Sequence, residues 1–216
     1  MDWFAGKDQV WESAIASDSA QAVDAAIRDG ADVNATGVRG VTPLMYAVGH
    51  SKKNAYAALL AKGAHLDTRD EEGDNAVTLA VSAYAKDPSY LTLALDAGSD
   101  PNTLRSDDDP VLVRFVNDRN LDAIRMMHRF KADINARTRT GEALIIHAGL
   151  LEYWDVVECL LQLGARFDYS GEPFTVQDIF SDARVTPPDS PLFPHKVRVA
   201  KFLRERGVVI APFEKQ

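Results

Sequence analysis

Cysteine is almost absent from this sequence, in which Cys159 is the only one among 216 residues. A single thiol excludes an intramolecular disulfide and a zinc site built from cysteines. No apolar run approaches 18 residues, so the sequence predicts no membrane-spanning helix. Residues 1–8 lack the basic and apolar regions of a secretory signal, and we therefore expect a cytoplasmic protein.

Positive charge is also scarce. The chain has 24 Lys and Arg against 32 Asp and Glu, which gives a formal net charge of −8. Because binding to nucleic acid rests mainly on Lys and Arg, this balance argues against a nucleic-acid partner. It suits a basic protein partner. Apolar residues make up 46% of the chain, which is typical of a globular protein with a sizeable core.

Five short strings resemble one another along the chain. They begin at residues 30, 63, 98, 131 and 164, and the first reads Gly30-Ala31-Asp32-Val33-Asn34. Each follows an apolar stretch with helical spacing, so its first residue is placed to end a helix in the left-handed conformation that glycine adopts easily. Lys131 holds that place in the fourth string, and a positive φ there would cost roughly 1 kcal/mol.

A second motif recurs ten to twelve residues after the strings, most clearly as Thr42-Pro43-Leu44-Met45. Thr followed by Pro is a good helix start, because the hydroxyl caps the helix and Pro at its first position loses no needed hydrogen bond. The equivalent segments begin at Asn75 and Ala143, and the one at Pro110 is eroded.

Together the two motifs resemble the ankyrin repeat of 33 residues, in which Thr-Pro-Leu-His-x-Ala opens helix one and Gly-Ala-Asp-Val-Asn closes helix two. The resemblance covers roughly residues 8–210. It implies an all-α, ankyrin-repeat solenoid of about six helix–turn–helix repeats with hairpin fingers, in one domain with terminal repeats as caps. The predicted repeats are 8–37, 40–69, 73–104, 108–137, 141–170 and 174–213.

Some residues depart from the family pattern. The family's His is replaced by other residues, so its bracing hydrogen bond is expected to be missing; the replacements are Met45, Thr78, Val113 and Ile146. Two extra residues are expected in the third repeat, around residues 84–88. Trp11 and Leu60 are expected to be buried between repeats, and Trp3 and Phe4 to fold over the open end of the first repeat.

The last repeat contains a proline-rich loop between Arg184 and His195. Pro188, Pro191 and Pro194 recur every three residues, which is the period of a polyproline II ligand for an SH3-type domain. The other interpretation is an insertion in which Leu192 and Phe193 pin the loop over the end of the core.

No catalytic motif is present. The sequence has no Gly-rich phosphate loop, no Gly-x-Ser-x-Gly and no His-Glu-x-x-His. Its histidines fall in different repeats without metal-ligand spacing, and Cys159 lies at an inward helical position. We therefore predict no enzyme, no catalytic residue, no cofactor and no metal.

Two acidic clusters lie in the links that the resemblance makes into fingers: Asp70-Glu71-Glu72 and Asp107-Asp108-Asp109. They are either solvated turns or an acidic strip that meets a basic partner. Neighbouring fingers carry the opposite charge at Arg39, Arg137 and Arg139. A surface of both signs favours a specific protein partner.

The resemblance also implies that binding residues lie on the inner helices. Three residues share one relative position in their repeats: Tyr46, Arg114 and His147. Aromatic residues and Arg are enriched at interface hot spots, although packing or solvation would explain the same residues. Further candidates on these helices are His50, Asp118 and Leu150.

The sequence thus predicts a non-enzymatic protein–protein interaction module that is a monomer when free. By analogy with small stand-alone ankyrin proteins, we expect an inhibitor or an immunity protein that neutralises a cognate, basic toxin or effector. The alternative is a scaffold or regulatory subunit of a cellular enzyme. Neither interpretation involves a nucleic acid or a membrane.

Overall fold

The computed structural model describes residues 2–169, 175–181 and 186–213. Over these residues the regular elements are all helical, and the remaining ladder contacts are isolated bridge residues, among them the antiparallel pair Arg137 and Ala143. The contacts divide the chain into two compact parts, an N-terminal part (residues 1–106) and a C-terminal part (residues 107–216). The prediction of an all-α repeat fold is confirmed, and the prediction of one domain stays a prediction.

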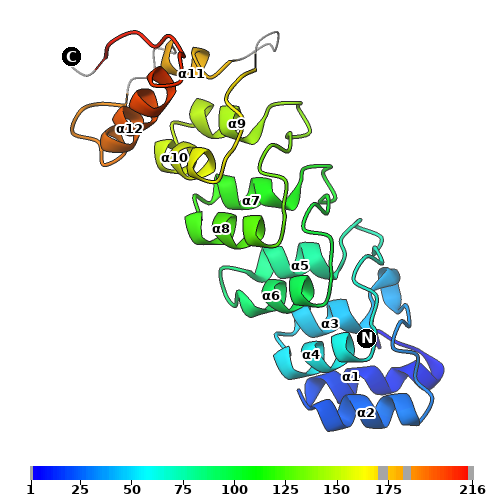
Figure 1. Cartoon of the computed structure of the whole chain (residues 1–216). Helices are drawn as coiled ribbons and strands as arrows, with labels where there is room; N and C mark the ends of the chain where they lie inside the picture. Colours follow the sequence, from blue (N-terminus) through cyan, green and yellow to red (C-terminus); the bar gives the residue numbers. More distant parts are fainter. Residues whose placement is uncertain (1, 170–174, 182–185, 214–216) are drawn as a thin grey trace. The chain divides into compact units, whose positions relative to one another are not determined.

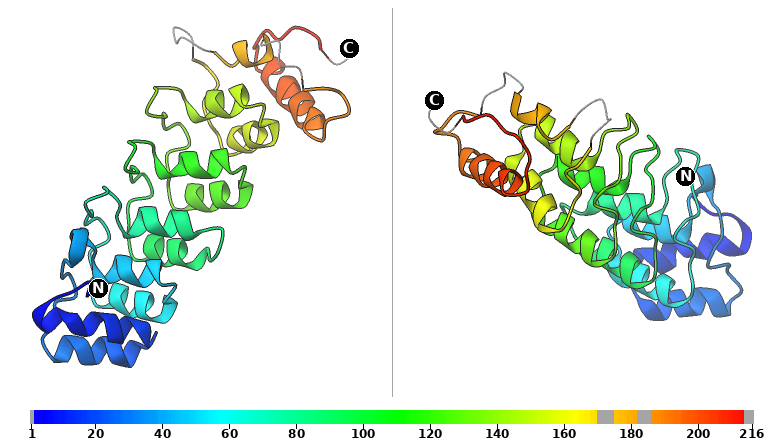
Figure 2. Two further views of the ribbon diagram at one scale, coloured as in Figure 1. Left: turned by 180° about the vertical axis from the view of Figure 1, so that it is seen from behind. Right: turned by 45° about the horizontal axis from the view of Figure 1, so that its top comes forward.

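The N-terminal part contains three antiparallel helix pairs after a short 3₁₀ helix at Gly6–Gln9. First helices contact first helices of the neighbouring pair, and second helices contact second helices, so the pairs stack in two rows (Figures 1 and 2). The pairs are α1 (Val10–Ala16) with α2 (Ala20–Arg28), α3 (Pro43–Gly49) with α4 (Lys53–Ala61), and α5 (Ala76–Ala83) with α6 (Ser89–Asp96).

The C-terminal part continues the pattern with two regular pairs and a modified last one. The elements are α7 (Val111–Asn117), α8 (Leu121–Arg129), α9 (Leu144–Leu150), α10 (Trp154–Gln162), α11 (Asp178–Ser181) and α12 (Phe193–Arg204). Among the described residues, no helix is long and apolar enough to cross a membrane.

The closing strings have a direct structural role. The Asp32 carboxylate accepts a hydrogen bond from the Asn34 backbone at 2.9 Å, which forms a tight turn after α2. The Asn34 side chain then accepts from the backbone N–H of His65 in the next repeat, at 2.8 Å. Asn135 accepts from Arg166 in the same way, also at 2.8 Å. One string therefore ends its own helix pair and ties it to the following pair.

The first turns of α3 and α5 show which contacts form where the family pattern has its histidine. Thr42 accepts from the Met45 backbone at 3.2 Å, and Asn75 accepts from the Thr78 backbone at 2.9 Å. The Thr78 hydroxyl also accepts from the Asn75 N–H and donates to the Asp74 carboxylate, each at 2.9 Å. The expectation that bracing is missing is therefore wrong at Thr78, whose hydroxyl is short enough to reach back to the backbone.

The core follows the predicted helical faces with one shift. Trp11 is fully buried, as expected, and its indole N–H donates to the Asp32 carbonyl at 2.9 Å. Leu60 is only half-buried, whereas Leu59 is completely buried. The expectation for Leu60 is wrong because the inner face of α4 carries Leu59 four residues after Ala55, and the next residue points about 100° away from it.

The N-terminal residues do not cover the open end of the first repeat. Their rings instead contact Tyr46 in the second repeat, with centroid distances of 6.0 Å for Trp3 and 5.8 Å for Phe4. In Figure 1 the N-terminus accordingly lies beside α3.

The last repeat differs most from the regular pattern. Ser190 donates to the Pro187 carbonyl at 2.9 Å, and Pro194 lies in the first turn of α12. This segment is a turn followed by a helix, so the polyproline II interpretation is wrong. Leu192 and Phe193 are half-buried, and Phe193 contacts the ring of Phe213. Arg184 lies outside the described residues.

Gly149 allows the short helix α11 to approach α9. It takes the place that valine holds in earlier repeats, and a Cβ there would lie 2.5 Å from the Cδ1 atom of Ile179. The five-residue link between α5 and α6, compared with three residues between α3 and α4, contains the two extra residues predicted for the third repeat.

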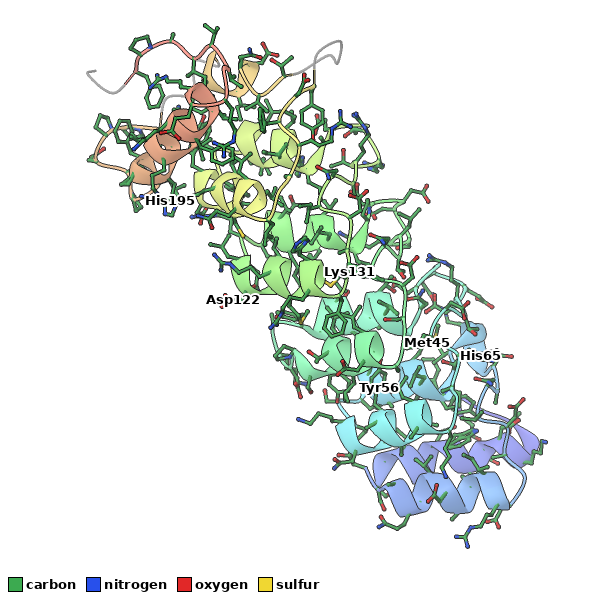
Figure 3. All side chains as sticks on the ribbon, in the orientation of Figure 1. Met45, Tyr56, His65, Asp122, Lys131 and His195 are labelled. Atoms are coloured by element: carbon green, nitrogen blue, oxygen red, sulfur yellow. The ribbon has the colours of Figure 1, made fainter. Side chains whose placement is uncertain are left out.

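Lys131, which is labelled in Figure 3, has a φ of +72°, in the left-handed region. We expect Lys131→Gly to raise the free energy of unfolding by roughly 1 kcal/mol, because glycine adopts this conformation without strain. The matched control is Gly164→Ala, which should lower it by a similar amount, since φ is +92° there and no atom obstructs a Cβ. Urea denaturation of both variants measures the effect, and an unchanged or lower midpoint for Lys131→Gly would contradict it.

The shifted register of α4 can be tested with two adjacent leucines. Leu59→Ala should cost about 2–5 kcal/mol of unfolding free energy, as expected for a completely buried leucine. Leu60→Ala should cost clearly less, because its side chain is half-buried. Equal losses in denaturant midpoint for the two variants would show that the burial is assigned wrongly.

Candidate functional site

The first two fingers interact directly in the N-terminal part. The Arg39 guanidinium forms an ion pair with the Glu72 carboxylate, and the Arg39 carbonyl accepts from the Glu71 N–H at 2.9 Å. Both charged side chains remain exposed. Arg39 and Glu72, which were both predicted to contact a partner, therefore pair with each other. The Glu71 side chain beside them is exposed.

Asp70 builds the turn of the second finger. Its carboxylate accepts from the backbone of Glu72 at 3.0 Å and of Asp74 at 2.9 Å. Arg69 donates to the carbonyls of Gly73 and, at 2.8 Å, Leu104. This finger is thus fixed by the Asp70 carboxylate, which the sequence analysis placed in an acidic cluster, and by the Arg69 guanidinium.

The second acidic cluster opens the C-terminal part. Asp108 has a φ of +64°, at the place where Gly73 and Gly141 hold the equivalent left-handed turn. The Asp109 carboxylate accepts from the Arg139 backbone at 2.8 Å, and the Asp107 carboxylate accepts from the Asp109 backbone at 3.3 Å. Asp107 and Asp108 are exposed, whereas Asp109 is half-buried.

The fourth finger is braced by one of its predicted binding residues. The Arg137 guanidinium donates to the Gly141 carbonyl at 2.7 Å, as Arg69 does in the second finger. The Arg139 side chain is exposed at the tip. Arg137 therefore has a structural role, although it is exposed as Arg139 is.

On the inner helix of the second repeat, Tyr46 is half-buried and its ring stacks on His50 at 3.9 Å. The Nδ1 atom of His50 lies 2.9 Å from the Tyr46 carbonyl. Burial, and secondly the charge of Glu12, raises the pKa of the Tyr46 hydroxyl. These two predicted residues form one aromatic group.

The inner helices of the C-terminal part bring together a polar group. Arg114 pairs with Asp118 one turn later, at 2.6 Å. His147 lies between two repeats, with Nδ1 3.2 Å from Glu142 and Nε2 2.8 Å from the Asn117 side chain. The predicted residue Leu150 is half-buried at the end of α9.

Within each part of the chain, several of the predicted residues form local pairs. Within the N-terminal part, Arg39 is joined to Glu72, and Tyr46 to His50. Within the C-terminal part, Asp109 is joined to Arg139, and Arg114 to Asp118. Their role in binding a partner stays a prediction.

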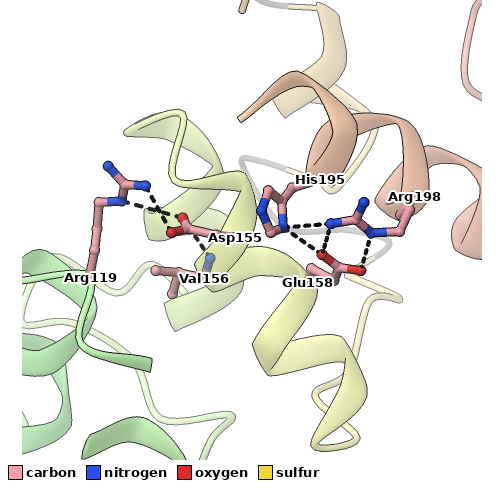
Figure 4. A network of polar contacts seen from close by, with 6 residues as sticks. All are labelled: Arg119, Asp155, Val156, Glu158, His195 and Arg198. Carbon is pink, nitrogen blue, oxygen red and sulfur yellow. Dashed lines mark hydrogen bonds and ion pairs between the residues drawn. The ribbon is translucent and has the colours of Figure 1, made fainter. Parts of the chain in front are cut away.

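A network between α10 and α12 was missed by sequence reasoning (Figure 4). Glu158 accepts a two-pronged hydrogen bond from Arg198, at 2.6 and 2.9 Å, and lies 2.6 Å from Nδ1 of His195. The Arg198 hydrogen bond, assisted by that of His195, lowers the pKa of Glu158 although burial opposes it. The His195-x-x-Arg198 spacing on one helix face was the available signal.

Lys196, also missed, is 4% exposed. Its ammonium lies over the rings of Trp154 at 4.8 Å, Phe213 at 5.4 Å and Phe180 at 5.9 Å, which favours the cation. Burial lowers the pKa of this amine, and the charge of Glu152 opposes the shift. No sequence signal separated this lysine from the exposed basic residues of α12.

The described residues contain no group of three His, Cys, Asp or Glu side chains that could hold a metal ion. Cys159 is 2% exposed, and burial raises the pKa of its thiol. A thiol of this kind is a poor nucleophile, because the thiolate is the reactive form.

No family model matches this sequence, and no curated protein matches it. Among solved structures, it is similar to the ankyrin repeat domain of Bcl-3, a member of the IkappaB family, with 21% identity and a TM-score of 0.64 over 74% of this chain and 71% of that chain. It is also similar to an ankyrin repeat domain from Acinetobacter baumannii AYE, with 20% identity and a TM-score of 0.62 over 75% and 84%. The chain therefore has the ankyrin-repeat fold.

Glu158→Gln tests the α10–α12 network. Because the folded-state pKa of Glu158 is lowered, its ionised form stabilises the fold above the ordinary value of 4.5, and this contribution is lost as the pH falls through the folded-state pKa. We expect the variant to lose about 1–3 kcal/mol at pH 7, and the difference from the wild type to shrink below about pH 4.5.

Urea denaturation at pH 7 and at acid pH measures this difference. Glu205→Gln, an exposed change of the same charge in the same part of the chain, serves as the control. A pH-independent loss for Glu158→Gln would contradict the ionic origin of the effect.

Proposed function

We propose that this chain is a non-enzymatic module that binds a folded protein through its fingers and inner helices. We further propose that it acts as an inhibitor or immunity protein of a basic effector. The ankyrin-repeat fold supports the first statement, since such stacks present extended binding surfaces. The distribution of charge supports the second.

The observation that carries the proposal is the set of exposed carboxylates at the fingers. Glu71 and Glu72 extend from the second finger, and Asp107 and Asp108 precede α7. The N-terminal part contains 15 Asp and Glu against 9 Lys and Arg, a net charge of 9 − 15 = −6. Like charges gathered on exposed turns raise the rate at which an oppositely charged protein associates.

The finger carboxylates differ in their contacts: Glu72 pairs with the Arg39 side chain, and Asp107 accepts one long hydrogen bond, at 3.3 Å, within its own turn. Asp70 and Asp109 accept backbone hydrogen bonds within the fingers. Substitution of Asp70 or Asp109 would disturb the finger backbone. A change in binding could then not be assigned to the lost charge alone. A test of charge must therefore leave both unchanged.

The partner itself is identified by affinity capture from the native cell with mass spectrometry. The proposal expects one basic protein that binds stoichiometrically and loses its toxic or catalytic activity when bound. A captured enzyme of metabolism that stays active would favour the scaffold or regulatory alternative. A nucleic acid as the captured species would contradict both.

With the captured partner, we expect the variant Glu71→Gln, Glu72→Gln, Asp107→Asn, Asp108→Asn to associate about tenfold more slowly at low salt, with little change in the dissociation rate. The effect should fade as salt rises, because exposed charges are screened. Stopped-flow or surface-based kinetics at two salt concentrations measure both rates.

The matched control neutralises four other exposed carboxylates, two in each part of the chain: Asp29, Asp96, Asp189 and Glu205. Both variants change the net charge by the same amount. An equal loss of association rate in both would assign the effect to net charge alone and remove the fingers from the mechanism.

A further inference from the structure

Residues 2–5, which we call the N-terminal strap, pair with the backbone of the first finger. The Trp3 carbonyl accepts from the Val38 N–H at 2.7 Å. On the other side, the N–H groups of Trp3 and Phe4 donate to one oxygen of Glu12, at 2.6 and 3.3 Å. The strap is thus held through the main-chain groups of Trp3 and Phe4, and the chain bends at these two residues.

The side chains of the strap bind an aromatic surface. Trp3 and Phe4 both meet Tyr46 edge-on, with interplanar angles of 63° and 72°. His50 stacks on the same Tyr46 ring. Phe4 is 3% exposed, whereas Trp3 is only half-buried.

Gly37 is shaped to this contact. A Cβ at this position would lie 2.2 Å from the Trp3 carbonyl oxygen and 3.0 Å from Cδ1 of Phe4. Its φ of −91° is open to any residue, so the absence of a side chain is what the position requires. The first finger therefore has room for a bound main chain.

The strap covers the inner-helix position that the fold resemblance associates with partner contact. We infer that the surface formed by Gly37, Val38 and Tyr46 is a binding site for a short, bent segment with two adjacent aromatic side chains. The strap occupies this site within the chain, and a segment of the same chemistry in the partner protein replaces it. This deepens the proposed function and rests on it only for the existence of a protein partner.

Three features of the strap allow a partner segment to replace it in this site. It lies outside the helices, and the bonds described above are ones that a short peptide can reproduce. Gly6, with a φ of +60° and no atom near its missing Cβ, joins the strap to the first 3₁₀ helix. A glycine in this conformation is a natural hinge.

The experiment uses the full chain carrying Trp3→Ala and Phe4→Ala, which empties the aromatic site and leaves the rest of the sequence unchanged. The probe is a synthetic peptide with blocked ends and the sequence of residues 2–9, Asp-Trp-Phe-Ala-Gly-Lys-Asp-Gln. Its control has alanine in place of both aromatic residues. Chemical shifts of the Gly37 and Val38 amides report binding.

We expect saturable binding of the aromatic peptide to the variant, and none of the control peptide. The wild type should bind the peptide at least about tenfold more weakly, because the tethered strap competes at an effective concentration in the millimolar range. Adding Gly37→Ala to the variant should abolish binding, since the Cβ occupies the place of the peptide carbonyl.

Several results would overturn the inference. A variant that is folded by circular dichroism yet shows no saturable shift would do so, as would equal binding of the control peptide. A wild-type dimer with exchanged straps would assign the site to a second copy of the chain instead. None of these outcomes bears on the acidic fingers, so the charge-based proposal is tested separately.

Hydrogen exchange on the wild type keeps the inference testable if the double variant does not fold. The Val38 amide, bonded to the strap, should exchange at least about tenfold faster than the amide of Ala47, a fully buried residue inside α3, because the strap opens without unfolding the helix. Equal protection of both amides would show that the strap is a permanent cap and would overturn its exchange.

Discussion

Each helix pair of this protein can bury its apolar face only against a neighbouring pair, and the other features of the fold depend on that constraint. The closing strings enforce it locally, because Asn34 and Asn135 bond the backbone of the following repeat. Stacking buries the apolar faces of the helices against the neighbouring pairs. What remains for recognition is the row of fingers and the outward edge of each first helix.

The same constraint leaves the terminal pairs with one uncovered face, and the chain treats its two ends differently. Near the beginning, the aromatic residues of the strap contact Tyr46 of the second pair and not the open end of the first. In the C-terminal part, α12 packs on α10 through the Glu158 network, and Lys196 fills an aromatic pocket. The aromatic rings around the buried Lys196 ammonium offset part of the cost of burying its charge.

The repeat was predictable from the sequence because its signals are local. A glycine after a helix and a Thr-Pro before one act within a single turn. Because five copies of the closing string recur at nearly constant spacing, the repeat could be assigned from the sequence alone. The left-handed conformation of Lys131 followed from the same alignment of strings. The half-burial of Leu60 was not predictable, since two adjacent leucines fit the periodicity almost equally well.

The candidate site was less predictable, because its geometry depends on contacts between repeats. Exposure of the finger charges follows from their position in turns, but the pairing of Arg39 with Glu72 requires two fingers to lie side by side. The strap contacts Tyr46 more than 40 positions away, at no fixed period. Lys196 has the sequence context of an exposed helical cation, and only the three-dimensional arrangement of Trp154 and Phe213 changes that interpretation.

The central claim is that the fingers and inner helices hold a folded partner. Hydrogen exchange of the full chain, with and without the captured partner, tests it most directly. The account predicts slower exchange at the finger segments 37–42, 69–75, 104–110 and 137–143 when the partner is bound, with unchanged exchange along the outer helices α2, α4, α6 and α8. Protection confined to those outer helices would contradict it.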